Sequence, residues 1–174
     1  MNRKIALVEY HFGKRTSFYT LVFADEADIL KDSETELFFA AHEESHPKQV
    51  ELIIEKIELM SRVWGATEYH FKNETSRDRI NLWAIPRFDK KGNKFSGTLR
   101  LFCLRFGSGV VILGNGGIKP KGVRTYQEVP ELEAAALVLE NVANEIEQKL
   151  RGKEIALTDD EILYDGELVF EIEL

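Results

Sequence analysis

The stretch TLRLFCLRF at residues 98–106, the turn GSG at 107–109 and the apolar run VVIL at 110–113 together decide the fold. Two apolar runs joined by a short glycine-containing turn predict an antiparallel pair of strands. Because side chains alternate along a regular strand, Arg100 and Arg105 should face opposite sides unless a bulge intervenes. At most one of these arginines is therefore expected to line any single face.

Two further features extend this pair. Residues 79–85 form another predicted strand, ended by Pro86, and the glycines at 114–117 read as a turn that ends the strand at 109–113. Short connections of this kind favour an antiparallel meander. Residues 4–10 and 17–23 predict a β-hairpin whose turn contains Gly13.

Helical periodicity is clearest over residues 47–64, where apolar residues including Trp64 recur on one face. Ser45 is the predicted N-cap, Pro47 fits the first turn and Gly65 is the predicted stop. A second long helix runs from about Pro130 to Gly152. A shorter helix of two or three turns is expected between residues 25 and 46.

The acidic C-terminal segment predicts two short strands, 155–157 and 168–172, separated by Asp165 and Gly166. With 174 residues, 44% apolar and 30% charged, the composition excludes a disordered chain. The sequence therefore predicts one α+β domain over residues 1–174, with helices packed on a small antiparallel sheet.

Some functional classes are disfavoured at once. Cys103 is the single cysteine, so no internal disulfide forms, and it reads as a small core residue. The apolar run at residues 5–8 is too short for a secretory signal or a membrane span. We therefore expect a cytoplasmic protein without membrane contact, disulfide or cofactor.

Charge is unevenly distributed along the chain. The formal net charge is −7, yet residues 67–127 carry 12 basic and 4 acidic side chains, while residues 128–174 carry 3 and 14. We call residues 67–127 the basic island. Such asymmetry suggests an anionic partner for the island. The alternative is that the island and the acidic segment pair with each other in the fold.

Residues 42–46 read HEESH, which matches the HExxH pattern of zinc hydrolases. Pro47 argues against that function, because the residue before a proline is disfavoured in a helix and His46 would sit at a helix end. A solvated connection between two helices is the competing interpretation.

The loop after the glycines, IKPKGVRTY at 118–126, is basic and closes with an aromatic residue. Glycines allow close approach of a polyanion, cations neutralise phosphate, and a tyrosine can stack on a base. The loop therefore suggests nucleic-acid binding, although a glycine-rich turn with solvated lysines would look similar.

The order of these elements resembles the RelE-like toxins, closest to the Gp49-like and HigB-like branch. The resemblance covers residues 34–127 and includes YHFKNE at 69–74, WAIP at 83–86, LRLFCLR at 99–105 and VVILGNGGIK at 110–119. It implies two helices on a small antiparallel sheet with basic residues at the strand ends. The hairpin at 1–24 and the helix with acidic tail at 128–174 would be additions.

The resemblance implies a ribosome-associated mRNA endoribonuclease, the toxin of a toxin–antitoxin pair, with mRNA on the ribosome and an antitoxin protein as partners. In such enzymes the ribose 2′-hydroxyl attacks the adjacent phosphate while basic side chains stabilise the developing charge. Carried over by position, the catalytic residues are Arg100, Lys119, Arg124 and Tyr126. The expected RNA-binding residues are Lys72, Arg87, Arg105 and Lys121, and no metal is implied.

A non-catalytic protein-interaction domain on the same scaffold remains an alternative. In that case the basic island would dock an acidic partner or the acidic tail of the chain itself, and the tail could cover the positive face.

Overall fold

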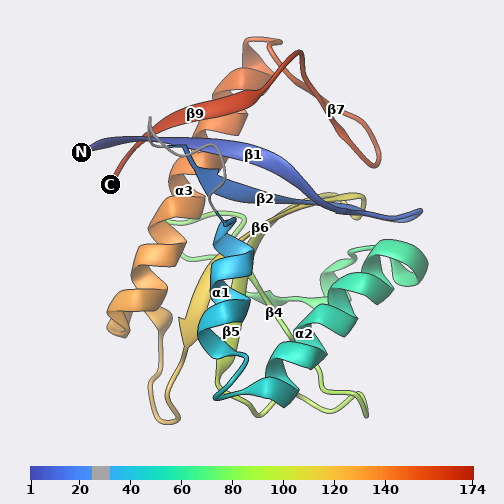
Figure 1. Cartoon of the computed structure of the whole chain (residues 1–174), viewed down its shortest axis with the longest axis vertical. Coiled ribbons are helices and arrows are strands. Elements are labelled where there is room, and N and C mark those ends of the chain that lie inside the picture. The colour runs from blue at the N-terminus through green and yellow to red at the C-terminus, as the bar shows by residue number, and fades with distance from the viewer. Residues whose placement is uncertain (25–31) are drawn as a thin grey trace.

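A computed structural model describes residues 1–24 and 32–174 of the chain (Figure 1). Its α-helices are α1 (Glu34–His42), α2 (Pro47–Leu59) and α3 (Pro130–Arg151). Short helical turns cover Met60–Trp64, Glu68–His70 and Tyr126–Glu128. The strands are β1 (Asn2–Phe12), β2 (Ser17–Phe23), β3 (Lys72–Asn73), β4 (Trp83–Ile85), β5 (Leu99–Phe106), β6 (Val110–Ile118), β7 (Ala156–Leu157), β8 (Ile162–Leu163) and β9 (Leu168–Glu173).

Seven of these strands form one sheet in the order β3-β4-β5-β6-β2-β1-β9. Pairing is antiparallel except between β2 and β6, which run parallel. The α+β class with a mostly antiparallel sheet is therefore confirmed. No helix in the described part of the chain is long and apolar enough to cross a bilayer.

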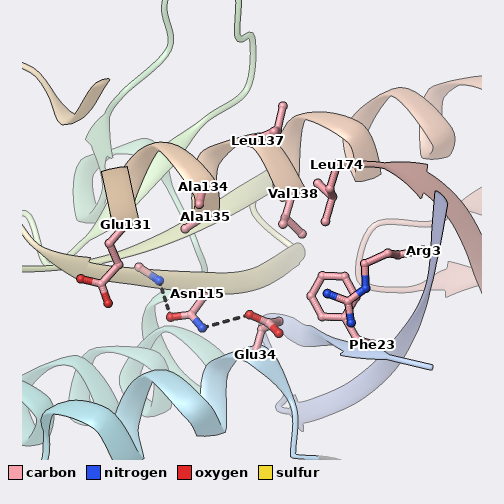
Figure 2. A pocket seen from close by; sticks show the side chains of 11 residues that line it. Arg3, Phe23, Glu34, Asn115, Glu131, Ala134, Ala135, Leu137, Val138 and Leu174 are labelled. Atoms are coloured by element: carbon pink, nitrogen blue, oxygen red, sulfur yellow. Dashed lines mark hydrogen bonds between the residues drawn. The ribbon is translucent and has the colours of Figure 1, made fainter. Parts of the chain in front are cut away.

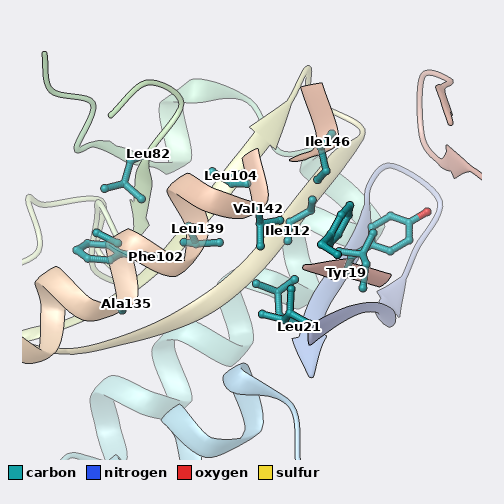
Figure 3. Close-up of a cluster of buried hydrophobic side chains, with 14 of the residues drawn as sticks. Tyr19, Leu21, Leu82, Phe102, Leu104, Ile112, Ala135, Leu139, Val142 and Ile146 are labelled. Carbon is teal, nitrogen blue, oxygen red and sulfur yellow. The ribbon is translucent and has the colours of Figure 1, made fainter. Parts of the chain in front are cut away.

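The sheet separates two apolar clusters. On one face α3 packs its buried side, including Leu139 and Val142, against Phe102, Leu104 and Ile112 of the central strands (Figure 3). On the other face α1 and α2 cover residues of opposite parity, such as Leu101 and Cys103. Alternation along β5 thus gives each face its own core.

The N-terminal hairpin is confirmed, and it is extended to β1 and β2. The turn requires a glycine at position 13 because a Cβ there would collide with Ser61, a contact that the sequence did not reveal. The backbone N–H groups of Arg15 and Thr16 both donate to the Ser61 carbonyl. The hairpin turn is therefore fastened to the end of the second helix.

The helix predicted over 47–64 is present, with a different beginning and end. Ser45 does not cap it; His46 occupies the N-cap position without a side-chain cap, and Ser45 Oγ instead pairs with His46 Nδ1. After Leu59 the helix continues as a π-turn through Trp64 and stops at Gly65, whose φ is +77°. The wider turn rotates Trp64 away from the buried face predicted for it, leaving 40% of the residue exposed.

The short helix expected between 25 and 46 is α1, while residues 25–31 lie outside the described ones. Ser33 caps α1 in a capping box: the Glu36 N–H donates to Ser33 Oγ and the Ser33 N–H to the Glu36 carboxylate. This reciprocal pairing satisfies two N–H groups that the first helical turn would leave free.

Two strand boundaries were predicted wrongly. The strand expected over 79–85 is limited to β4, because Asn81 has a φ of +63° that breaks an extended chain. The strand expected to end at 113 continues to Ile118 through the glycines. A Cβ at Gly116 would strike the Arg100 carbonyl, so these glycines permit close approach between strands and do not form a turn.

The acidic C-terminal segment is part of the core sheet. Its final strand β9 pairs with β1 and buries Leu168, Phe170 and Ile172. The β7–β8 hairpin also docks, since the Ile162 N–H donates to the Tyr19 hydroxyl. In the sheet order β9 lies at the opposite end from β3. This position matters for the hypothesis that the acidic tail covers the positive face.

Candidate functional site

Three basic residues from separate parts of the sequence converge on one face of the sheet. Lys72 of β3 pairs with Ala84, which in turn pairs with Phe102, and Arg100 lies two residues before Phe102. Arg100 pairs with Gly117, two residues before Lys119. Paired residues share a face and so do residues two apart, so these side chains all lie on the face of α3. We call Lys72, Arg100 and Lys119, with Glu74, the cation cluster.

The pKa of Lys119 reflects how close these groups lie to one another. The pKa of Lys119 is lowered first by burial and then by the positive charge of Lys72, and Arg100 lowers it further while Glu74 raises it. Lys72 Nζ lies 3.4 Å from Glu74 Oε1, a carboxylate that is largely shielded from solvent. The cluster therefore combines a net positive charge with a lysine that releases its proton more easily than usual.

Arg100 is held in place by its own backbone. Its Nη1 donates to the carbonyls of Gly97 and Leu99 at 3.0 and 2.9 Å, and its guanidinium lies 5.4 Å from the centre of the Phe95 ring. Burial lowers its pKa, yet a guanidinium remains charged at any physiological pH. Arg100 thus supplies a fixed positive charge beside Lys119.

Arg105 lies on the other face of the sheet, as strand alternation predicted. Its Nε and Nη2 donate to the Ala66 carbonyl at 3.1 and 2.6 Å, and its guanidinium lies about 5 Å from the Phe71 and Trp83 rings. The pairing of β5 with β6 contains a bulge, and its extra residue is in β6, so the alternation of side chains along β5 is unaffected. Arg105 holds the chain that follows α2.

The other predicted residues lie apart from the cation cluster or are enclosed. Tyr126 is 3% exposed, packs edge-on against Phe102 with ring centres 5.3 Å apart, and offers no free face to a base. Lys121 and Arg124 are exposed in the loop after β6. Arg87 follows β4 and lies over the Phe88 ring. The roles assigned to these residues from the resemblance stay predictions.

One residue of the basic island does pair with the acidic segment at 128–174. Arg79 forms a bidentate pair with Glu133 and a second bond to Glu140, both on α3. These contacts raise the pKa of Arg79 above its usual value. The pairing alternative therefore holds for Arg79, whereas Arg100 and Lys119 form no ion pair within the described residues.

The HExxH spacing does not assemble a metal site. His42 ends α1 and packs against Phe38, while His46 begins the next helix, and their ring centres are 6.3 Å apart. Within residues 1–24 and 32–174, no group of three or more His, Cys, Asp or Glu side chains could hold an ion. The two histidines belong to a connection between helices, and no third ligand joins them within the described residues, so the structure gives the zinc-hydrolase hypothesis no support.

A cavity of about 370 Å³ lies between α1, α3 and the strands β1, β2 and β6. Figure 2 shows Asn115 donating to Glu34 in the middle of the cavity. Glu131 lies at one end, on the other side of Asn115 from Glu34, and Arg3 lies over the Phe23 ring at the opposite end. Its lining includes two carboxylates and none of the cation cluster. This cavity does not suit a phosphate.

Sequence reasoning missed two groups. Glu74 was not proposed as a functional residue, and its place two residues after Lys72, on the same side of an extended chain, was the available signal. The exposed rings of Trp64 and Tyr69 were also missed, because helical periodicity assigned Trp64 to the core.

Comparison of the chain with protein-family models, curated proteins and solved structures gives no significant match.

Proposed function

We propose that this protein is a metal-independent endoribonuclease whose active site is the cation cluster, acting on translated mRNA as a RelE-like toxin would. The observation that carries the proposal is the convergence of Lys72, Arg100 and Lys119, which come from three separate strand ends. RNA cleavage places extra negative charge on a phosphate, and preorganised cations stabilise that charge. Two helices on one face of the sheet, α1 and α2, also fit the resemblance.

The cluster contains the groups that the reaction needs. The ribose 2′-oxygen forms a bond to the adjacent phosphorus while the bond from phosphorus to the 5′-oxygen breaks, leaving a 2′,3′-cyclic phosphate and a 5′-hydroxyl. The Glu74 carboxylate accepts the 2′-hydroxyl proton, and the Lys119 ammonium donates one to the departing 5′-oxygen. Arg100 and Lys72 balance the charge on the phosphate.

The strands that follow α3 in the acidic segment do not block this site by their position in the sheet. β9 is at the far end of the sheet order from β3, and Asp159 lies against Gly109, at the other end of β5 and β6 from Arg100 and Lys119. The antitoxin that the resemblance implies would therefore be a separate chain.

The test measures mRNA cleavage in a translating extract by wild type, Lys119→Ala, Glu74→Gln and Arg100→Ala, with cut sites mapped by primer extension. Lys14→Ala, an exposed lysine in the hairpin turn, is the matched control. We expect cleavage by wild type and by the control, and at least 100-fold slower cleavage by the other variants.

A folded wild-type protein that leaves translated mRNA intact would overturn the proposal and favour the interaction domain. Wild-type activity in the Lys119→Ala variant would move the active site elsewhere. Thermal unfolding of each variant separates a lost reaction from a lost fold.

A further inference from the structure

A second group of side chains gathers beside the cation cluster but on the other face of the sheet edge. It combines exposed rings with cations and spans the end of α2, the turn before β3 and the loop after β4. We call it the aromatic patch, and it consists of Lys56, Trp64, Tyr69, His70, Arg87 and Phe88.

The first half of the patch is built on Trp64. Its ring stacks on His70, with centres 4.7 Å apart and planes 9° from parallel, and Lys56 Nζ lies 5.4 Å from its centre. The π-turn at the end of α2 delivers the indole to this position. Single π-turns are frequent at functional sites.

The second half is built on Tyr69, which is 60% exposed. Its ring centre lies 4.9 Å from that of Phe88 and 5.3 Å, edge-on, from that of His70. The Arg87 guanidinium lies 4.8 Å from the Phe88 ring and donates to the Tyr69 carbonyl. In the described part of the chain Arg87 meets no carboxylate, so its charge is uncompensated.

Neither Trp64 nor Tyr69 belongs to one of the two core clusters. Trp64 and Tyr69 keep 40% and 60% of their surfaces exposed, in a chain whose other large rings are mostly buried. Exposed contiguous aromatic surface in a folded chain marks an interaction site. The cations over these rings determine what kind of partner fits, because a base offers a π-face and its phosphate offers a negative charge.

We propose that the aromatic patch binds single-stranded RNA, with bases stacking on Tyr69 and Trp64 and phosphates contacting Arg87 and Lys56. The choice of RNA rests on the proposed function. The inference adds where the strand is held: Tyr69 precedes Lys72 by three residues, and β3 is the last strand of the sheet. A strand passing around this edge contacts the patch on one face and the cation cluster on the other.

The alternative occupant is a protein, since tryptophan, tyrosine and arginine are also common at protein interfaces. Two observations favour RNA. A cation accompanies each exposed ring, and the loop that follows Phe88 adds Lys91 and Lys94, while Lys90 of the same loop pairs with Glu55. The patch therefore matches a polyanion with separated bases.

The experiment measures binding of a fluorescent 12-nucleotide single-stranded oligoribonucleotide carrying 2′-O-methyl groups, which cannot be cleaved. The variants are Tyr69→Leu and Arg87→Ala, and the matched controls are Ile80→Ala, which alters an apolar residue that is 72% exposed, and Lys14→Ala. We expect binding on the order of tenfold weaker for Tyr69→Leu, because a base loses its stacking partner. Arg87→Ala should also reduce the slope of log binding constant against log salt concentration by about one, because one phosphate contact is lost.

A perfectly paired duplex of the same sequence should compete poorly, because its bases are already stacked. Equal binding by wild type and Tyr69→Leu overturns the inference, even if the wild-type protein cleaves mRNA. Binding that depends on Tyr69 supports it even if no cleavage is seen, so the two proposals fail separately. Failure to bind RNA, with capture of a protein through Tyr69, assigns the patch to the other occupant.

Discussion

At the scale of single residues, environment decides what each basic side chain can do. Arg100 and Arg105 are five positions apart on one strand, yet one joins the cation cluster and the other is fixed on the Ala66 carbonyl. Burial and neighbouring charge lower the pKa of Lys119, whereas two carboxylates raise that of Arg79. Residue type alone would not distinguish these groups.

The pH dependence of cleavage should report on Lys119. If its ammonium donates the proton, the rate falls as pH rises through a pKa lying below the ordinary lysine value. Replacing Lys72 by Gln removes a positive charge that lowers this pKa. The falling limb of the pH–rate profile should therefore move to higher pH in Lys72→Gln, although the maximal rate drops. A limb that stays in place would remove Lys119 from the proton transfer.

His42 should make stability depend on pH. Burial is the main cause of its lowered pKa, with His46 also lowering it and Glu131 opposing the shift. The unfolded chain then binds a proton first as pH falls, so stability is lost between about pH 6.5 and the lower folded pKa. Urea unfolding at pH 7.5 and 5.5 should show a larger loss for wild type than for His42→Gln. Equal losses would exclude His42 as the cause.

At the scale of elements, a buried hydroxyl pair joins α1 to the place where the sheet opens. β2 and β6 pair over three residues, Ser17–Tyr19 with Val110–Ile112. Beyond that, Thr35 Oγ1 of α1 donates to the Gly114 carbonyl at 3.0 Å and lies 2.7 Å from Thr20 Oγ1. Thr35 therefore links two strands that no longer bond to each other.

Thr35→Val should destabilise the fold by about 1–3 kcal/mol, because it leaves a buried hydroxyl and a carbonyl without this partner. Thr20→Val should cost less, because the bond from Thr35 to Gly114 survives. Urea unfolding followed by circular dichroism compares the two variants. A Thr20→Val variant that is as unstable as Thr35→Val would contradict the assigned donor order.

At the scale of the whole molecule, the acidic C-terminal segment completes the sheet. Phe170 is 1% exposed and shares a cluster with Ile5 and Leu7 of β1. Its net negative charge lies on residues that face solvent, such as Glu171 and Glu173. The segment is therefore a structural strand with an acidic exterior.

A chain ending at Gly152 should accordingly fail to fold, because it loses β9, which pairs with the edge of β1 and adds Leu168, Phe170 and Ile172 to the core. Phe170→Ala should cost about 3–5 kcal/mol for the same reason. The double variant Glu171→Gln/Glu173→Gln should remain as stable as wild type, since both positions are exposed. Thermal unfolding and size-exclusion chromatography give the comparison. A folded truncated chain would show that the tail is dispensable.

The sequence by itself determined the elements whose signals are local. Periodicity placed the helix ending at Gly152 and the one beginning at Pro47, and alternation placed the hairpin and the core of β5. It also determined that Arg100 and Arg105 diverge, because strand parity requires no knowledge of the partner strands. The α+β class followed from these same patterns.

Only the tertiary structure decided which strands are neighbours, since pairing depends on contacts between residues far apart in the chain. The parallel pairing of β2 with β6, the place of β9 beside β1 and the convergence of Lys72, Arg100 and Lys119 are all of this kind. The exposure of Trp64 and the burial of Tyr126 were likewise decided by what packs around them. The periodicity of a local sequence predicts whether that segment is a helix or a strand. The burial and pKa of a side chain depend on neighbours that are distant in the sequence.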